Sequence, residues 1–297
     1  MNRTNKRDDL SLRNTYLFDA ENMVEFTRLI NQDRFVTRAM GGVRAGLPDL
    51  PSHPKILDLA CGSGGWVLDM AYELPDAEVC GVDSSSMIIE YANARASSQG
   101  ITNSSFGRMD ITKPLDFSDA SLDLIHARFL MGVLKRDAWF PIVTECQRLL
   151  RPGGLLQLVE GNDAGRSLSP ALEQLNHLGT QALWHTGYGF SPDGHTFGMA
   201  PGLLRLLKQT GYRDLRLCTT TLDHSADSEG WADFYHNQEL LLQGIKPLVL
   251  NCALTNEQEF DALYQKALIE MYADDFTAIG QILSIRGRKQ TENEEER

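Results

Sequence analysis

The stretch from Lys55 to Trp66, KILDLACGSGGW, most constrains the fold, because an apolar run enters a glycine-rich turn that opens a helical pattern. A buried strand, a glycine turn and a helix in that order begin a βαβ unit that holds a nucleotide. The alternation recurs in four further apolar runs, AEVCGVD, SSFGRMDI, LDLIHARFL and LLQLVEG. Strands separated by helices predict an α/β fold with a doubly wound, mainly parallel, Rossmann-like sheet covered on both faces.

The overall charge limits the partners of the chain. Its 297 residues carry a formal net charge of −12, which argues against a nucleic-acid partner. No apolar run reaches the ~20 residues of a membrane span, and the first residues lack the apolar core of a signal peptide. The 5 cysteines lack metal-ligand spacing. They predict reduced thiols of a cytoplasmic protein without a metal site, and leave a homo-oligomer open.

The carboxylate of Asp58, at the end of the first apolar run, distinguishes between two kinds of nucleotide. The dinucleotide fingerprint G-x-G-x-x-G has Val67 at its third glycine position here. Asp58 would repel a pyrophosphate, whereas an ammonium ~4 Å away is attracted by roughly 4 kcal/mol before desolvation. The residues therefore favour S-adenosylmethionine over NAD. The alternative is that Asp58 caps backbone amides of its own loop.

Two further acids end the next strands. Asp83 closes the second strand, where it is placed to accept both ribose hydroxyls. Met87, one turn into the following helix, is a candidate for the adenine face. Asp110 ends the third strand and is a candidate acceptor for the adenine amino group. Three acids at successive strand ends beside a glycine turn predict a nucleotide site.

The motifs LDLACGSGGW, GVDSSSM, RMDI, LDLIHARFL and LLRPGGLLQLVE resemble, in order and spacing, the class I S-adenosylmethionine-dependent methyltransferases. The resemblance covers residues 54 to 160 and implies a seven-stranded sheet. It also implies methyl transfer that leaves S-adenosylhomocysteine. The cofactor-binding residues it implies are Asp58, Ala60, Gly62, Gly64, Asp83, Ser84, Met87, Asp110 and Ile111, with His126, Ala127 and Arg128 on the methyl-donor side.

A second resemblance lies in the N-terminal stretch YLFDAENMVEFTRLINQDRF, which looks like the helical cap of a subgroup of small-molecule methyltransferases, including fungal secondary-metabolism enzymes. It implies that Tyr16, Arg28 and Gln32 close over the cofactor. Arg28 and Gln32 are four residues apart and share a helix face, which suits the methionine carboxylate. The alternative is a solvated arginine on an ordinary amphipathic helix.

The predicted domain order follows from these assignments. A cap at 1–45 precedes a cofactor-binding core at 46–160 and a lid insertion at 161–200. A core helix with strand six at 201–222, a helical lid at 223–275, and strand seven with an acidic tail at 276–297 complete the chain. Insertions at the carboxyl end of such a sheet set specificity. The substrate candidates are Tyr16, Trp184, His185, Tyr188 and His195, although aromatic residues also pack a lid onto its core.

We therefore predict methyl transfer to a small organic molecule, a secondary metabolite with an apolar or aromatic portion. A hydroxyl acceptor is helped by a general base. The sequence does not choose among His126, His185, His195 and His224, nor does it identify the acceptor or the methylated atom. The alternatives are a regulatory protein that binds the cofactor without chemistry, and a NAD-dependent oxidoreductase.

Overall fold

The computed structural model describes residues 23–291. Tyr16 and the first part of the predicted cap lie outside these residues. The strands are β1 Lys55–Leu59, β2 Glu78–Asp83, β3 Ser104–Arg108, β4 Leu122–Arg128, β5 Leu150–Gly161, β6 Arg166–Ser167, β7 Arg213–Asp223 and β8 Ala278–Arg288. The helices are α1 Met23–Met40, α2 Gly65–Glu73, α3 Ser86–Gln99, α4 Trp139–Leu149, α5 Pro170–His185, α6 Met199–Gln209, α7 Trp231–Asn251 and α8 Glu257–Met271, with short 3₁₀ helices at Leu130–Gly132 and Arg136–Ala138.

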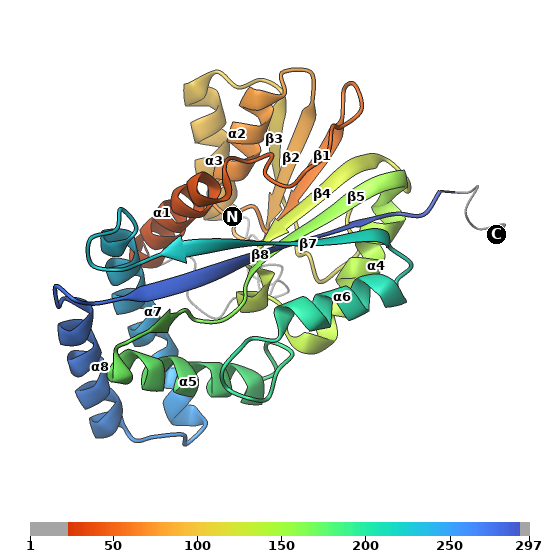
Figure 1. Cartoon of the computed structure of the whole chain (residues 1–297). Coiled ribbons are helices and arrows are strands. Elements are labelled where there is room, and N and C mark those ends of the chain that lie inside the picture. The colour runs from red at the N-terminus through yellow and green to blue at the C-terminus, as the bar shows by residue number, and fades with distance from the viewer. Residues whose placement is uncertain (1–22, 292–297) are drawn as a thin grey trace, which may run out of the picture.

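One sheet runs through the molecule, with its strands in the order β3-β2-β1-β4-β5-β8 and with β7 paired to the outer edge of β8 (Figure 1). The first five strands of that order are parallel. β8 runs antiparallel to both β5 and β7. The predicted doubly wound, mainly parallel α/β sheet is confirmed. The additional strand is β6, which pairs with β8 over two residues.

Several helices begin at residues whose side chains cap the first turn. Ser85, Ser169 and Asn256 each accept a hydrogen bond from an amide of the first turn of α3, α5 and α8. Such caps satisfy amides that have no partner within the helix. Gly100 ends α3 with a φ of 66°, in the left-handed region that suits a glycine. The helix boundaries in this part of the chain thus follow from local chemistry.

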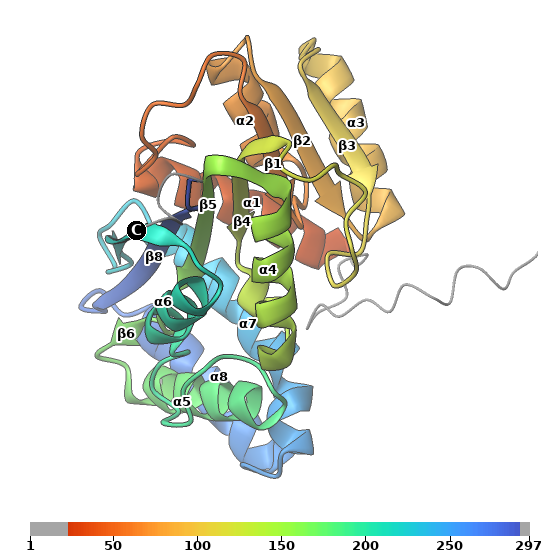
Figure 2. The ribbon, with the colours of Figure 1, turned by 90° about the vertical axis from the view of Figure 1, so that its right-hand side faces the viewer.

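Alternate residues of the central strands pack against two different helical layers. Ile56 and Leu124 pack with α2 on one face, whereas Leu57 and Ile125 pack with α4 and α6 on the other. Figure 2 looks onto the face that α4 and α6 cover. Because both faces are buried, these strands are apolar along their whole length, as expected for a parallel sheet.

A second core is built by α5, α7 and α8, which come from the two predicted lid segments. Leu175 of α5, Val249 of α7 and Phe260 of α8 are fully buried in one apolar cluster. Figure 1 shows the three helices together at the end of the sheet where β5 ends. Segments far apart in sequence therefore form one packed unit beside the carboxyl ends of the parallel strands, and α1 packs against α7 as well.

Candidate active site

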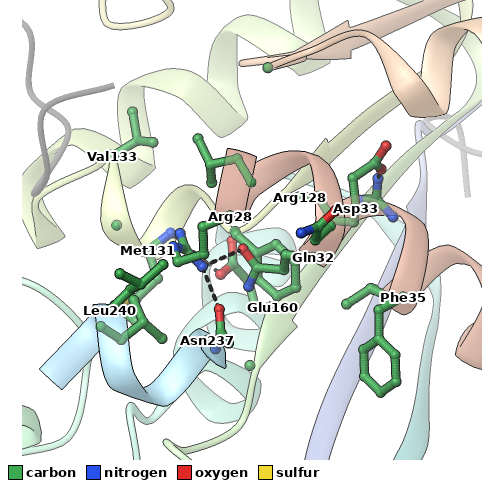
Figure 3. A pocket seen from close by; sticks show the side chains of 18 of the residues that line it. Arg28, Gln32, Asp33, Phe35, Arg128, Met131, Val133, Glu160, Asn237 and Leu240 are labelled. Carbon is green, nitrogen blue, oxygen red and sulfur yellow. Dashed lines mark hydrogen bonds and ion pairs between the residues drawn. The ribbon is translucent and has the colours of Figure 1, made fainter. Parts of the chain in front are cut away.

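A cavity of about 840 Å³ lies at the carboxyl ends of the parallel strands (Figure 3). Asp58, Asp83, Arg128 and Glu160 line it from the ends of β1, β2, β4 and β5, and residues of α1, α5 and α7 line its other side. This edge is where open α/β sheets bind ligands. The fold therefore joins the predicted nucleotide site and an adjoining chamber, lined by α1, α5 and α7, in one continuous cavity.

Most of the predicted cofactor residues meet at this cavity. Its lining includes Arg28, Gln32, Asp58, Ala60, Gly62, Asp83, Ser84, Asp110, Ile111 and Arg128. The predicted residues Gly64, Met87, His126 and Ala127 are not in the lining. Cys61, Ser63, Ser85, Ile88 and Met109 also line the cavity; the sequence analysis did not select them, although each is within two residues of one that it did.

The glycine turn after β1 presents bare backbone to the cavity. Gly62 has a φ of 52°, and a Cβ at this position would meet no heavy atom within 4 Å. Gly64 serves packing instead, because a Cβ there would lie 2.6 Å from a ring carbon of Phe106. Ala60 also has a positive φ of 52°, which is uncommon for a residue with a side chain. The turn thus combines a tight helix entry with an open surface at Gly62.

The carboxylate of Asp83 is held by the backbone around it. Its Oδ2 accepts the amide of Gly62 at 3.2 Å, and its Oδ1 accepts the amide of Ser85 at 3.0 Å. Burial raises the pKa of Asp83, while these amides act in the opposite direction. Each carboxylate oxygen has a further lone pair. The carboxylate is therefore oriented in advance and can still accept hydrogen bonds from a ligand's hydroxyl groups.

Asp58 interacts with His126, which the sequence analysis placed in the cofactor wall. Oδ1 of Asp58 lies 2.8 Å from Nδ1 of His126, and both side chains are buried. The imidazole stacks on Trp66 with the ring centroids 3.8 Å apart. Burial lowers the pKa of His126, against the pull of Asp58. A neutral imidazole that donates to the carboxylate fits this geometry, so His126 lies behind Asp58 rather than at the cavity.

Helix α1 brings Arg28 and Gln32 to the cavity on one face, as their spacing predicts. Nη1 of Arg28 donates to Oε1 of Gln32 at 3.1 Å and to Oδ1 of Asn237 in α7 at 2.7 Å (Figure 3). Glu25 forms an ion pair with the same guanidinium at 2.8 Å. The buried guanidinium therefore connects α1 to α7, which excludes the alternative of a solvated arginine.

A second arginine at the cavity, Arg128, is also engaged by α1. It forms an ion pair with Asp33 and donates to the hydroxyl of Thr37 at 2.9 Å. A Cβ at Gly65 would collide with the carboxylate of Asp33. Helix α1 thus lies directly over the glycine turn and the end of β4, and the carboxylate of Asp33 occupies the space that a side chain at Gly65 would need.

The predicted substrate residues of the first lid lie away from this cavity. Trp184 lies under the guanidinium of Arg136, 3.5 Å from the ring centroid, and Tyr188 is buried. His195 packs against His177, with the ring planes tilted by 30°, beside a separate hollow of about 110 Å³. His185 is in neither lining. The part of α5 that does line the large cavity is Leu175, Asn176, Gly179, Thr180 and Leu183.

Two buried titratable side chains of the cavity each have one polar atom without a hydrogen-bond partner among residues 23–291. His224 is stacked on Phe234, its Nδ1 has no hydrogen-bond partner, and burial lowers its pKa to about 4. Glu160 at the end of β5 has no partner for Oε1, and burial raises its pKa to about 8. His224 is among the histidines predicted from the sequence, whereas Glu160 is not among the predicted residues. The available signal was the position of an acid at a strand end, as for Asp83 and Asp110.

Two further properties concern residues 23–291 as a whole. No group of three or more histidine, cysteine or acidic residues is arranged to hold a metal ion. No helix within the same range combines the length and the apolar character needed to cross a bilayer.

Comparisons with known proteins agree with this architecture. Residues 56–154 match a family model described as a methyltransferase domain. A demethylmenaquinone methyltransferase of Lactiplantibacillus plantarum is 31% identical over 120 residues, 40% of this chain and 50% of that protein. Methyltransferase str3 of Strobilurus tenacellus is 31% identical over 108 residues, 36% of this chain and 35% of that protein. The chain thus spans half or less of the length of these relatives.

Among solved structures, phosphoethanolamine N-methyltransferase 2 of Haemonchus contortus, in complex with S-adenosyl-L-methionine, has a TM-score of 0.52 at 15% identity. The alignment covers 92% of this chain and 60% of that chain. At this identity the likeness concerns the fold alone. Residues 56–154 are a methyltransferase domain, and the sheet has the architecture of the class I S-adenosylmethionine-dependent methyltransferases.

Proposed function

We propose that this protein transfers a methyl group from S-adenosylmethionine to a small organic molecule with an apolar portion, such as a secondary metabolite. The observation that carries the proposal is the continuity of the cavity: one end is formed by the glycine turn and Asp83, and the other by apolar side chains of α5 and α7. The cofactor and an acceptor can therefore occupy adjoining parts of one space. The unpaired cysteines support a cytoplasmic setting.

The residues at the first end suit the parts of S-adenosylmethionine. The bare backbone at Gly62 allows a ligand to approach, and Asp83 is oriented to accept ribose hydroxyls. Oδ2 of Asp58 has no hydrogen-bond partner among the described residues, so it is available to the ligand's ammonium group. Arg28 and Gln32 offer donors for its carboxylate. When bound, the cofactor supplies an electrophilic methyl group on a sulfonium.

The second end of the cavity suits an apolar acceptor. Leu175 and Leu183 of α5 face this space together with Phe234 and Leu242 of α7. Transfer of a methyl group depends mainly on alignment and on exclusion of water. Helices α5, α7 and α8 can align the acceptor and exclude water, because they cover the carboxyl ends of the strands with apolar surface.

Calorimetric titration with S-adenosylmethionine tests the proposal. We expect the wild type to bind, and Asp83→Asn to bind at least about tenfold more weakly, because the variant retains the shape but loses the charged acceptor. Asp227→Asn, in the loop before α7 and outside the cavity lining, is the matched control and should bind as the wild type does. No binding by the wild type, or equal binding by Asp83→Asn, would contradict the proposal.

The two alternatives predict different outcomes in the same experiments. A regulatory protein would bind S-adenosylmethionine but leave no labelled methyl group on any metabolite of its source organism. A NAD-dependent oxidoreductase would bind the nicotinamide cofactor in the titration and not S-adenosylmethionine. Incubation with methyl-labelled cofactor and a metabolite extract, followed by mass spectrometry, therefore separates all three functions.

A further inference from the structure

Glu160 ends β5 with its side chain buried inside the fold and facing the cavity. The residue is 1% exposed, yet it is part of the cavity lining. Its Oε2 accepts the amide of Met131 at 3.4 Å, in the turn that follows β4, and the neighbouring amide of Leu130 also lowers the pKa of the carboxyl group. Its Oε1 has no hydrogen-bond partner within residues 23–291. One oxygen therefore holds the turn, and the other is available to a molecule in the cavity.

A structural role accounts for only one of the two carboxyl oxygens of Glu160. Holding the Met131 amide requires one acceptor oxygen, which a glutamine provides without a charge. Burying a carboxyl group with an unpartnered oxygen costs free energy, and such atoms are rare in folded proteins. The unpartnered Oε1 indicates that a hydrogen-bond donor arrives with a ligand.

The cations that line the cavity are engaged elsewhere. Arg28 is paired with Glu25, and Arg128 is paired with Asp33. Among the other titratable groups of the lining, His224 is buried, and His236 lies 3.6 Å from the carboxylate of Glu239. The remaining groups are the thiol of Cys61 and the acids Asp58, which is bonded to His126, Asp83, Asp110, Asp163, which accepts the amide of Gly165, and Asp233. Burial dominates the raised pKa of Glu160, and no charged neighbour contributes to it. The carboxyl group therefore lacks a fixed counter-ion in the described part of the chain.

We propose that Glu160 is the catalytic residue that accepts the proton of a hydroxyl group on an apolar methyl acceptor. The inference rests on the proposed methyl transfer and adds the acceptor class and the base. A neutral hydroxyl enters an apolar chamber at a lower desolvation cost than an ammonium group does. A general base works best when its pKa is near the working pH, and burial brings the pKa of Glu160 to about 8.

The atoms and charges balance without a further reactant. The hydroxyl O–H bond breaks, and its proton passes to Oε1 of the ionised Glu160. The acceptor oxygen forms a bond to the methyl carbon as the carbon–sulfur bond breaks, and that electron pair remains on the sulfur. The products are a methyl ether, a neutral thioether and protonated Glu160, which then releases its proton to solvent.

Four proteins test the inference: wild type, Glu160→Gln, Glu160→Asp and the control Glu257→Gln. Glutamine retains an oxygen for the Met131 amide, so Glu160→Gln should fold and bind S-adenosylmethionine within about twofold of wild type. Glu257 begins α8 at the surface, where it forms an ion pair with Lys246. Glu257→Gln is the matched control, because it also removes one carboxylate but lies outside the cavity. Each protein is given methyl-labelled cofactor and a metabolite extract of the source organism, and the labelled products are identified by mass spectrometry.

We expect O-methylated products from the wild type and Glu257→Gln. Glu160→Gln should be slower by at least about 100-fold, and Glu160→Asp by about tenfold, because general-base catalysis contributes roughly 10²–10⁴. The wild-type rate should rise with pH through about pH 8 and level off above it, and the Glu160→Gln rate should not. Difference infrared spectroscopy provides a readout without turnover: a protonated carboxyl band in the wild type should disappear through pH 8 and be missing in Glu160→Gln.

The outcomes separate this inference from the proposed function. If the wild type methylates a product but Glu160→Gln is equally fast, or both have the same pH profile, Glu160 is not the base and only this inference fails. A labelled methyl group on nitrogen or carbon would show that the acceptor is not a hydroxyl group. A missing carboxyl band in the wild type would show that Glu160 is not protonated below pH 8. If the wild type fails to bind the cofactor or to transfer label, the proposed function fails, and this inference fails with it.

Discussion

Asp58 and His126 are cross-strand neighbours in the register of β1 and β4, and their side chains meet 2.8 Å apart inside the fold. The imidazole is held flat against Trp66, with 2° between the ring planes. Because burial lowers the pKa of His126, the neutral ring donates from Nδ1 to Asp58. His126 is thus a positioning residue that orients an acid of the cavity from behind.

Replacement of His126 by phenylalanine should therefore destabilise the fold. The phenyl ring retains the stacking on Trp66 but leaves the buried Asp58 carboxylate without its hydrogen-bond donor, at a cost of about 1–3 kcal/mol. Urea denaturation at pH 7 measures the change. His236→Phe, at an exposed position of α7, should change the free energy of unfolding by less than about 0.5 kcal/mol. Equal stabilities for the two variants would show that the pair is dispensable.

Alanine substitutions at two glycines should have opposite consequences. Gly64 has a φ of +74°, and its Cβ would lie 2.6 Å from Phe106, so Gly64→Ala should destabilise by about 2 kcal/mol or more. Gly107 in β3 has open space at the Cβ position, so Gly107→Ala should be close to neutral. Thermal unfolding of both variants provides the measurement. A neutral Gly64→Ala would mean that the turn relaxes freely.

The parts of the site that the sequence predicts best depend on local patterns. Asp83 and Gly62 belong to a strand–turn–helix unit whose geometry follows from neighbouring residues. Glu160 carries the same local signal, an acid at a strand end, but its raised pKa depends on burial by the whole fold, which the sequence does not specify.

Other features depend on contacts between distant segments. The Asp58–His126 pair requires β1 and β4 to be neighbours in a given register, which no local pattern specifies. The aromatic and histidine content near Trp184 predicts a substrate contact there, whereas the residues of α5 that line the cavity include Leu175 and Leu183. Which face a helix buries depends on its tertiary neighbours, here α7 and α8.

Loss of the Arg28 guanidinium should weaken cofactor binding. Arg28→Met retains much of the apolar stem but removes the contact between α1 and Asn237, and it leaves Glu25 without this partner. We expect the dissociation constant for S-adenosylmethionine to rise about tenfold, or about 1.4 kcal/mol. Arg38→Met, at an exposed position of the same helix, is the control. Unchanged affinity in Arg28→Met would exclude a role for this face of α1.

His224 should make the fold sensitive to acid. Its pKa is lowered by burial to about 4, so between the ordinary value near 6.5 and pH 4 the unfolded chain binds a proton that the folded chain does not. Stability is therefore lost as the pH falls through this window, by up to about 3 kcal/mol. His224→Phe, which retains stacking on Phe234, should lack this loss, whereas His236→Gln should retain it. Urea denaturation at pH 7.5 and pH 4.5 compares the three proteins, and parallel losses would contradict the assignment.

Glu160 should make the fold sensitive to alkali. Its pKa is raised by burial to about 8, so between the ordinary value of 4.5 and pH 8 the folded chain holds a proton that the unfolded chain has lost. The stability from the protonated side chain is complete below pH 4.5 and declines as the pH rises through 8. Glu160→Gln removes this decline, so its free energy of unfolding should exceed that of the wild type by several kcal/mol more at pH 9 than at pH 5. Glu257→Gln should differ from the wild type by the same small amount at both pH values. A pH-independent difference for Glu160→Gln would show that the carboxyl group is already ionised in the folded protein, and a buried acid poised to exchange a proton with a ligand would then be excluded.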